Sequence, residues 1–207
     1  QLNKELVDQQ VPYSIVKEHY EIVLNTLKEI DENQLALVNT LTDLSQQEKS
    51  IRDGLDVFEL DLRNMKRTIE KYHLPGLPKE YLELFFATSS RIEQLSQLMN
   101  RVKLDMTEIT GLNQTIEDDV EKLDIMTEEI VDHAQLTEYM IQHANRYRLD
   151  HPEIDTAIQQ ALEQFNHFYR YEESLAIIEK ALNQVEPGSA QRVRDNYQAE
   201  KNNSLFF

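Results

Sequence analysis

The chain has 207 residues, of which 40% are hydrophobic and 29% are charged, and its formal net charge is −17. Four glycines and five prolines are too few for the turns of an all-β or α/β fold, and the absence of cysteine excludes disulfides. The acidic balance opposes nucleic-acid binding, because phosphate contacts need Lys and Arg. No apolar run approaches the roughly 20 residues that span a bilayer.

The first predicted element is one long helix over residues 13–72. Steps of three and four residues from Tyr13 to Tyr72 fall on apolar residues or tyrosine, except at Gln34 and Glu48. Such a seam is typical of a helix that supercoils against partner helices, here about 90 Å long. Gln34 and Glu48 either set the register or lie at the edge of the seam. We interpret residues 1–12 as the end of a preceding helical segment of a longer protein.

A second helix is predicted over residues 79–144. It follows Leu74-Pro-Gly-Leu-Pro78, whose prolines and glycine end the first helix and reverse the chain. Its seam continues through Met99, Val102 and Met106, which predicts an unbroken helix of roughly 95 Å. The first two helices would then pair as an antiparallel hairpin.

The third helix is predicted over residues 152–186, after a break that contains Pro152. Pro187-Gly188 ends it, a short C-terminal helix over 189–201 follows, and residues 202–207 are expected to fray. The fold class is therefore all-α. We expect an elongated antiparallel three-helix bundle of the spectrin-repeat or coiled-coil type, which is thin at the Leu74–Pro78 turn unless residues 189–201 cover it.

Two surfaces are candidate contact sites for other proteins. The first is a corner where the second helix ends, with the side chains of Gln142, Asn145, Arg146, Tyr147 and Arg148. Arg and Tyr are frequent in interface hot spots, although arginines near a helix C-terminus also suit the helix dipole. The second is an apolar cluster that either caps the hairpin or contacts a partner, formed by Leu74, Leu77, Tyr81, Phe85 and Phe86.

No residue pattern indicates catalysis, a cofactor or a metal site. The sequence has no Gly-rich phosphate loop, nucleophile motif or zinc spacing. A di-iron bundle needs two Glu-x-x-His pairs on facing helices, and the chain has only Glu70 to His73. We therefore expect a non-enzymatic protein. A coiled-coil spacer or dimerisation rod without a specific binding patch is the alternative to a binding protein, and self-association stays open.

Three segments resemble the C-terminal part of the EzrA family of septation ring formation regulators. They are residues 74–89, residues 142–148 and residues 171–188, and the Val11-Pro-Tyr-Ser14 stretch is also similar. The family has a C-terminal patch with the pattern Gln-x-x-Asn-Arg-Tyr-Arg. The matching residues here are Gln142, Asn145, Arg146, Tyr147 and Arg148.

The resemblance implies a scaffold that regulates bacterial cell division. Members have spectrin-like repeats in a cytoplasmic region at the division septum, anchored by one N-terminal transmembrane helix that this sequence lacks. They bind the tubulin-like protein FtsZ and restrain ring assembly at wrong sites. They also contact membrane-bound division and cell-wall synthesis proteins.

Overall fold

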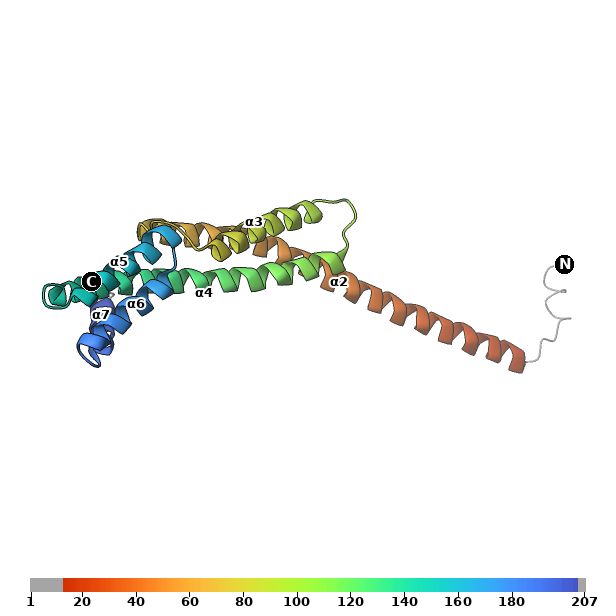
Figure 1. Ribbon diagram of the computed structural model, residues 1–207. Coiled ribbons are helices and arrows are strands. Elements are labelled where there is room, and N and C mark those ends of the chain that lie inside the picture. The colour runs from red at the N-terminus through yellow and green to blue at the C-terminus, as the bar shows by residue number, and fades with distance from the viewer. Residues whose placement is uncertain (1–12, 205–207) are drawn as a thin grey trace, which may run out of the picture. The chain divides into compact units, whose positions relative to one another are not determined.

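The computed structural model describes residues 13–204, and these residues are all-α (Figure 1). The helices are α2 (Tyr13–Lys71), α3 (Lys79–Met99), α4 (Met106–Ala144), α5 (Pro152–Glu163), α6 (Tyr171–Val185) and α7 (Ser189–Ser204). The chain divides into two compact units, residues 1–52 and residues 53–207. The helical segment expected over residues 1–12 lies outside the described residues. Residues 202–204, expected to fray, are the last residues of α7.

The described part of the first unit is the N-terminal portion of α2. Its heptad seam is exposed to solvent, including Tyr20 (67% exposed) and Leu37 (60% exposed). The other large hydrophobic side chains exposed on this stretch are Ile22, Val23, Leu24, Leu27, Ile30, Leu35, Val38, Leu41 and Leu44. The seam is continuous, as its sequence pattern indicates, and it is exposed over more than six turns of helix.

The second unit contains an antiparallel hairpin of α3 and α4. Tyr81 near the start of α3 and Thr127 in α4 are hydrogen-bonded, with 2.9 Å between their hydroxyl oxygens. Closer to the turn, Arg91 and Asp119 form an ion pair. The contacts join an early residue of one helix to a late residue of the other. Hence α3 and α4 run in opposite directions (Figure 1).

The prediction of one helix over 79–144 is therefore wrong. The chain leaves the helix at Asn100 and re-enters it at Met106. The carboxylate of Asp105 caps α4 by accepting hydrogen bonds from the backbone N–H groups of Thr107 (3.1 Å) and Glu108 (3.2 Å). The apolar spacing continued across this turn by coincidence, since Val102 is fully exposed.

The predicted third helix is also broken, into a hairpin of α5 and α6. A π-helical turn (Gln164–Phe168) ends α5, and Tyr169 then takes a left-handed backbone conformation with φ of 57°. The hydroxyl of Ser174 on α6 donates to the backbone oxygen of Ala161 on α5 at 2.7 Å. The two helices are therefore antiparallel, and α6 runs in the direction of α4.

The C-terminal half of α4 packs with α5, α6 and α7 in one core. Its buried residues are Leu136, Met140, Ala144, Ile154, Ala157, Ile158, Ala161, Leu175, Ile178, Ala181, Leu182, Ala190, Val193 and Tyr197. The helix expected over 189–201 is α7, which begins after Gly188 (φ 80°) and packs on α4 and α6.

The Leu74–Pro78 turn is not the thin end that we expected. The hydroxyl of Tyr171 at the start of α6 donates to the backbone oxygen of Gly76 at 2.6 Å. The ring of Tyr169 lies so close to Gly76 that an added Cβ would stand 2.5 Å from it. The α5–α6 junction therefore covers the turn, because the reversal at residues 100–105 brings α4 back towards it. Within residues 13–204, no helix is long and apolar enough to cross a membrane.

Candidate functional site

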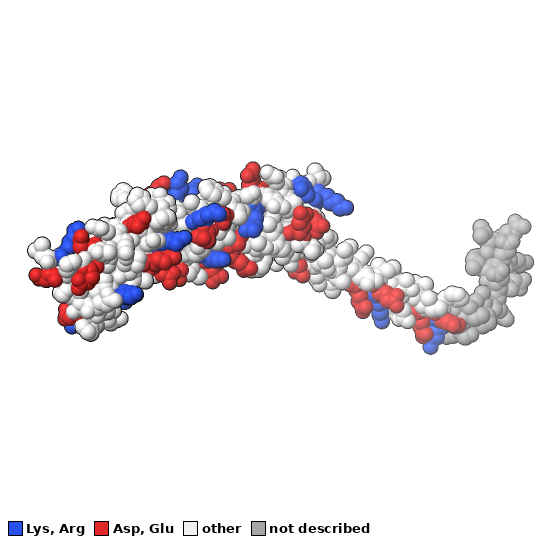
Figure 2. All heavy atoms as spheres, viewed as in Figure 1, with Lys and Arg blue, Asp and Glu red and all other residues white. Residues whose placement is uncertain are grey.

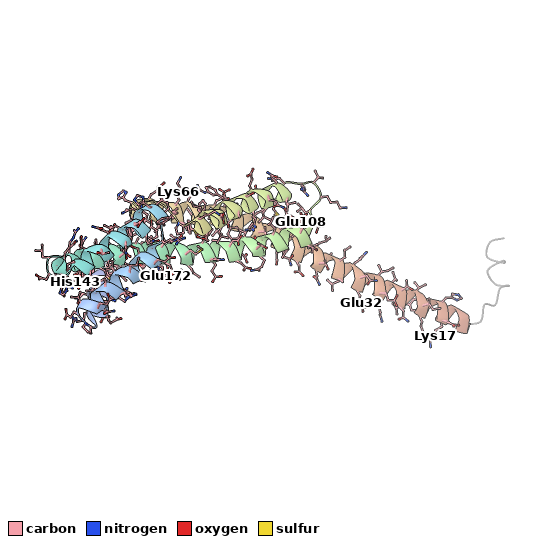
Figure 3. All side chains as sticks on the ribbon, in the orientation of Figure 1. Lys17, Glu32, Lys66, Glu108, His143 and Glu172 are labelled. Atoms are coloured by element: carbon pink, nitrogen blue, oxygen red, sulfur yellow. The ribbon has the colours of Figure 1, made fainter. Side chains whose placement is uncertain are left out.

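The corner predicted from residues 142–148 lies at the end of α4 and in the 3-10 turn Asn145–Tyr147. The side chains of Gln142, Asn145, Arg146 and Arg148 are exposed, and Tyr147 is half-buried. Figure 3 marks the place with the label of His143, close to the end of α4. The structure therefore brings all five predicted residues to one corner of the second unit.

Tyr147 fixes this corner to the end of α6. Its hydroxyl donates to the carboxylate of Glu186 at 3.0 Å, and Arg192 of α7 forms an ion pair with the same carboxylate. The hydrogen bond from Tyr147, followed by Arg192, lowers the pKa of Glu186 below its ordinary value. The same bond raises the pKa of Tyr147, because it favours the protonated phenol. The main role of Tyr147 is therefore to hold the turn after α4 against the C-terminal end of α6.

The two arginines of the corner have different environments. Arg148 forms an ion pair with Asp155 of α5, which ties the turn to the next helix. Arg146 has no hydrogen-bond or ion-pair partner among the described residues. Its charge adds to burial in lowering the pKa of His143. Gln142, Asn145 and Arg146 are therefore the members of the corner that are free to meet a partner.

The second predicted surface is only partly accessible. Tyr81 is 1% exposed and hydrogen-bonded to Thr127, so it belongs to the core and not to a contact surface. Leu74, Leu77 and Phe85 are half-buried, whereas Phe86 is 66% exposed. The surface is reduced to an apolar strip around Phe86.

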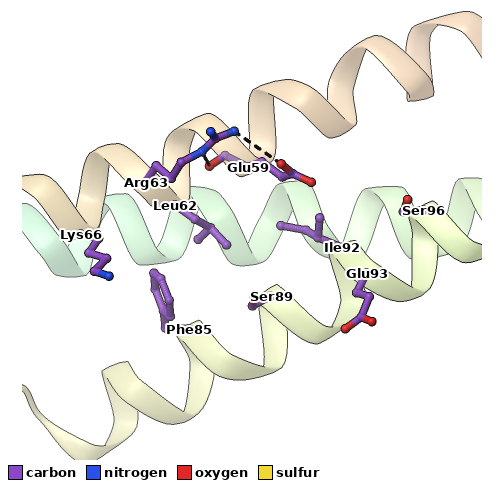
Figure 4. A pocket seen from close by; sticks show the side chains of 9 residues that line it. All are labelled: Glu59, Leu62, Arg63, Lys66, Phe85, Ser89, Ile92, Glu93 and Ser96. Carbon is purple, nitrogen blue, oxygen red and sulfur yellow. Dashed lines mark hydrogen bonds and ion pairs between the residues drawn. The ribbon is translucent and has the colours of Figure 1, made fainter.

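A groove between α2 and α3 extends this apolar strip. It has a volume of ≈ 420 Å³, and its base is formed by Leu62, Phe85 and Ile92 (Figure 4). An ion pair between Glu59 and Arg63 lies along its α2 rim. A neighbouring hollow of ≈ 370 Å³ continues past Phe85 to Leu77, Phe86 and Ile69. Both hollows are shallow and open, as expected of a surface for another chain rather than for a small molecule.

No group of three or more His, Asp or Glu side chains in residues 13–204 is arranged to hold a metal ion. The corner offers hydrogen-bond donors and the unpaired cation of Arg146, and the strip around Phe86 offers apolar surface. Groups of these kinds are common at protein–protein interfaces.

Comparison with known proteins decides the family. The sequence model described as "Septation ring formation regulator, EzrA" matches residues 1–197, which include the whole corner. The chain belongs to the EzrA family. It is 39% identical to the EzrA of Enterococcus faecalis over 98% of its own length, 37% to that of Lactococcus lactis subsp. lactis over 90%, and 34% to that of Streptococcus sanguinis over 94%.

These matches cover 35%, 32% and 34% of the three relatives, so the chain spans about a third of their length. No solved structure matches it. The resemblance drawn from residues 74–89, 142–148 and 171–188 is thereby confirmed, and all three segments lie within the EzrA match.

Sequence reasoning missed several residues of the EzrA corner. Glu186, which lies 39 positions along the chain, accepts the hydrogen bond from Tyr147, and Arg192, 45 positions along, forms an ion pair with Glu186. No local sequence pattern indicates either contact. Leu149, which is 96% exposed next to the motif, could have been noticed as an apolar residue within a polar turn. Leu149 is an exposed apolar side chain three positions after Arg146.

Proposed function

We propose that this chain is the partner-binding part of a non-enzymatic septation ring regulator, and that the corner at residues 142–148 contacts the division machinery. The partners are FtsZ and the membrane-bound division and cell-wall synthesis proteins. The effect of the whole protein is to restrain FtsZ ring assembly at wrong sites. The chain acts in the cytoplasm at the division septum, as part of a protein with a single N-terminal membrane anchor.

The observation that carries this proposal is the accessibility of Arg146 on a firmly held corner. Its neighbours are fixed, because Tyr147 is bonded to Glu186 and Arg148 is paired with Asp155. A fixed corner reduces the entropy lost when a partner binds. A cation on a protein of net charge −17 also directs an acidic partner segment to this place and away from others.

The test is the substitution Arg146→Glu, assayed by co-sedimentation of the chain with FtsZ polymers. We expect binding to weaken by about tenfold, which corresponds to roughly 1.4 kcal/mol. The matched control is Arg67→Glu, an equal charge change at an exposed arginine of α2 outside the corner. Helix content and melting temperature should be unchanged in both variants. Equal binding by Arg146→Glu and the unmodified chain would refute the proposal.

We further propose that the part of α2 in the second unit (residues 53–71), α3 and the first half of α4 form one spectrin-like repeat. Three helices in up-down-up order, with buried residues such as Leu62, Leu95 and Ile116 on the facing sides, support this bundle type.

The alternative is a coiled-coil spacer or dimerisation rod without a specific patch. The exposed seam of residues 20–44 favours it, because such a stripe is typical of a helix that pairs with another. A spacer would keep its function after Arg146→Glu and lose it when the seam is made polar. The two variants therefore separate the two functions.

A further inference from the structure

A second groove in the same unit lies between α2 and α4, away from the corner and from the α2–α3 groove. Its volume is ≈ 510 Å³. Buried side chains form its apolar base: Phe58 and Met65 come from α2, and Val120 comes from α4. Such a base offers a favourable place for an apolar side chain of a protein, because burial there removes apolar surface from water.

The rim of this groove is anionic. None of its lining residues is Lys or Arg. Five carboxylates line it, those of Asp61, Glu117, Glu121, Asp124 and Glu128. None of the five forms an ion pair with a described residue. An acidic segment is repelled here, whereas an apolar side chain between two cations matches both the base and the rim.

The α3–α4 loop carries this complementary pattern. Val102 at its tip is fully exposed, and Arg101 and Lys103 on either side are exposed as well. Neither cation forms an ion pair with a described residue. In Figure 2, blue spheres stand out at the end of α3 where this loop lies. An exposed valine between two free cations is unusual on a chain with 38 acidic and 21 basic residues.

The loop does not reach the groove of its own chain. The groove begins on α4 at Glu117, whereas α4 itself begins after the loop at Met106. Eleven residues of straight helix separate them, which is about 16 Å. A second copy of the chain is needed to bring the two surfaces together.

We propose that the Arg101-Val102-Lys103 loop of one copy docks in the α2–α4 groove of another. Val102 enters the apolar base, and the two cations pair with the carboxylates on the rim. The interface joins two different surfaces, so each copy keeps one free loop or groove and the contact extends into chains. Exposed ion pairs are individually weak and screened by salt, so the association is weak and strongest at low ionic strength.

The first measurement is sedimentation equilibrium of the 207-residue chain over a range of concentrations at low salt. We expect the average mass to rise past the dimer with concentration and to fall back towards the monomer at high salt. Two variants should each weaken the association by about tenfold or more. They are Arg101→Glu/Lys103→Glu in the loop and Glu121→Lys/Glu128→Lys in the groove.

Two controls make charge reversals of the same sign outside both surfaces, each with half the charge change of the corresponding double variant. Lys122→Glu and Asp118→Lys alter exposed residues of α4 that do not line the groove, and they should associate as the unmodified chain does. A circular dichroism spectrum and a melting curve for each variant establish that all of them fold.

Mixing the two variants gives the sharpest result. The loop variant keeps an intact groove and the groove variant keeps an intact loop, so an equimolar mixture should form 1:1 pairs that do not grow further. A symmetric dimer through another surface would not regain association on mixing. A chain that stays monomeric at low salt overturns the proposal, even where a separate basic peptide binds the groove. Association that survives in both variants overturns it as well.

Discussion

Tyr171 connects two parts of the second unit that lie 95 residues apart in the sequence. Its side chain is 2% exposed, and its hydroxyl donates to the backbone oxygen of Gly76 at 2.6 Å. Burial raises the pKa of Tyr171 to about 12, because the charged phenolate is disfavoured away from water. This one hydroxyl holds the turn before α3 against the start of α6.

Replacing Tyr171 with Phe removes that hydrogen bond and leaves the Gly76 oxygen without its partner. We expect Tyr171→Phe to lower the free energy of unfolding by about 1 kcal/mol, measured by urea denaturation at neutral pH. Tyr20→Phe, at a tyrosine that is 67% exposed, is the matched control and should change stability little.

The pH dependence of the free energy of unfolding follows from the raised pKa of Tyr171. The unfolded chain loses the Tyr171 proton near the ordinary pKa of 10, and the folded chain retains it to about 12. This contribution to stability is therefore complete below pH 10 and is lost between about 10 and 12. The Phe variant should lose less stability across that window than the unmodified chain. If the free energy of unfolding falls equally steeply with pH in both proteins, Tyr171 is not the group responsible for the loss.

At the corner, the sequence pattern predicts where the residues lie but not which groups surround each of them. The polar residues and the proline that follow predict a helix end at Gln142 to Arg148, and the structure has them there. The pattern did not distinguish Arg146, which is free, from Arg148, which is paired with Asp155. That difference depends on how α5 folds back, and tertiary contacts of this kind leave no local signal.

Among the elements, the N-terminus of α4 is capped by a single side chain, that of Asp105. Asp105 satisfies two backbone N–H groups that would otherwise lack a partner at the start of α4. We expect Asp105→Ala to cost about 1 kcal/mol of unfolding free energy, as is usual for the loss of an N-cap. Thermal or urea denaturation measures it. Asp118→Ala, an exposed aspartate inside α4, is the control and should not destabilise. Equal stability of Asp105→Ala and the unmodified chain would mean that the loop is held by other contacts.

The sequence pattern missed two chain reversals, the α3–α4 loop and the α5–α6 turn. Both show where hydrophobic periodicity stops being informative. The heptad spacing of Met99, Val102 and Met106 persists across the α3–α4 loop, so the seam alone predicts an unbroken helix. Asp105-Met-Thr-Glu108 has the spacing of a capping box and was the available signal. The α5–α6 turn has no proline or glycine, and its left-handed residue is Tyr169. A non-glycine residue at positive φ is uncommon and is imposed by packing, so sequence could not reveal it.

For the molecule as a whole, the two units differ in what stabilises their helices. The second unit buries large side chains such as Leu123, Met140 and Leu182 completely. The described helix of the first unit has a long apolar seam with most of its side chains open to solvent. An isolated helix in water is only marginally stable, because helices in proteins gain most of their stability from packing an apolar face. The two units should therefore differ in stability within one chain.

Hydrogen exchange tests this difference directly. We expect the amides of residues 20–44 to exchange at the rate set by local opening of the helix. The amides of α4 around Met140 should exchange at the slower rate set by unfolding of the second unit. The contrast measures how far α2 depends on a partner along its exposed seam. If a second helical chain or a longer form of the protein covers that seam, protection of residues 20–44 should rise while protection of α4 stays constant. Uniform protection across α2 and α4 in the 207-residue chain would contradict this, because an uncovered helix has no tertiary packing to slow its opening.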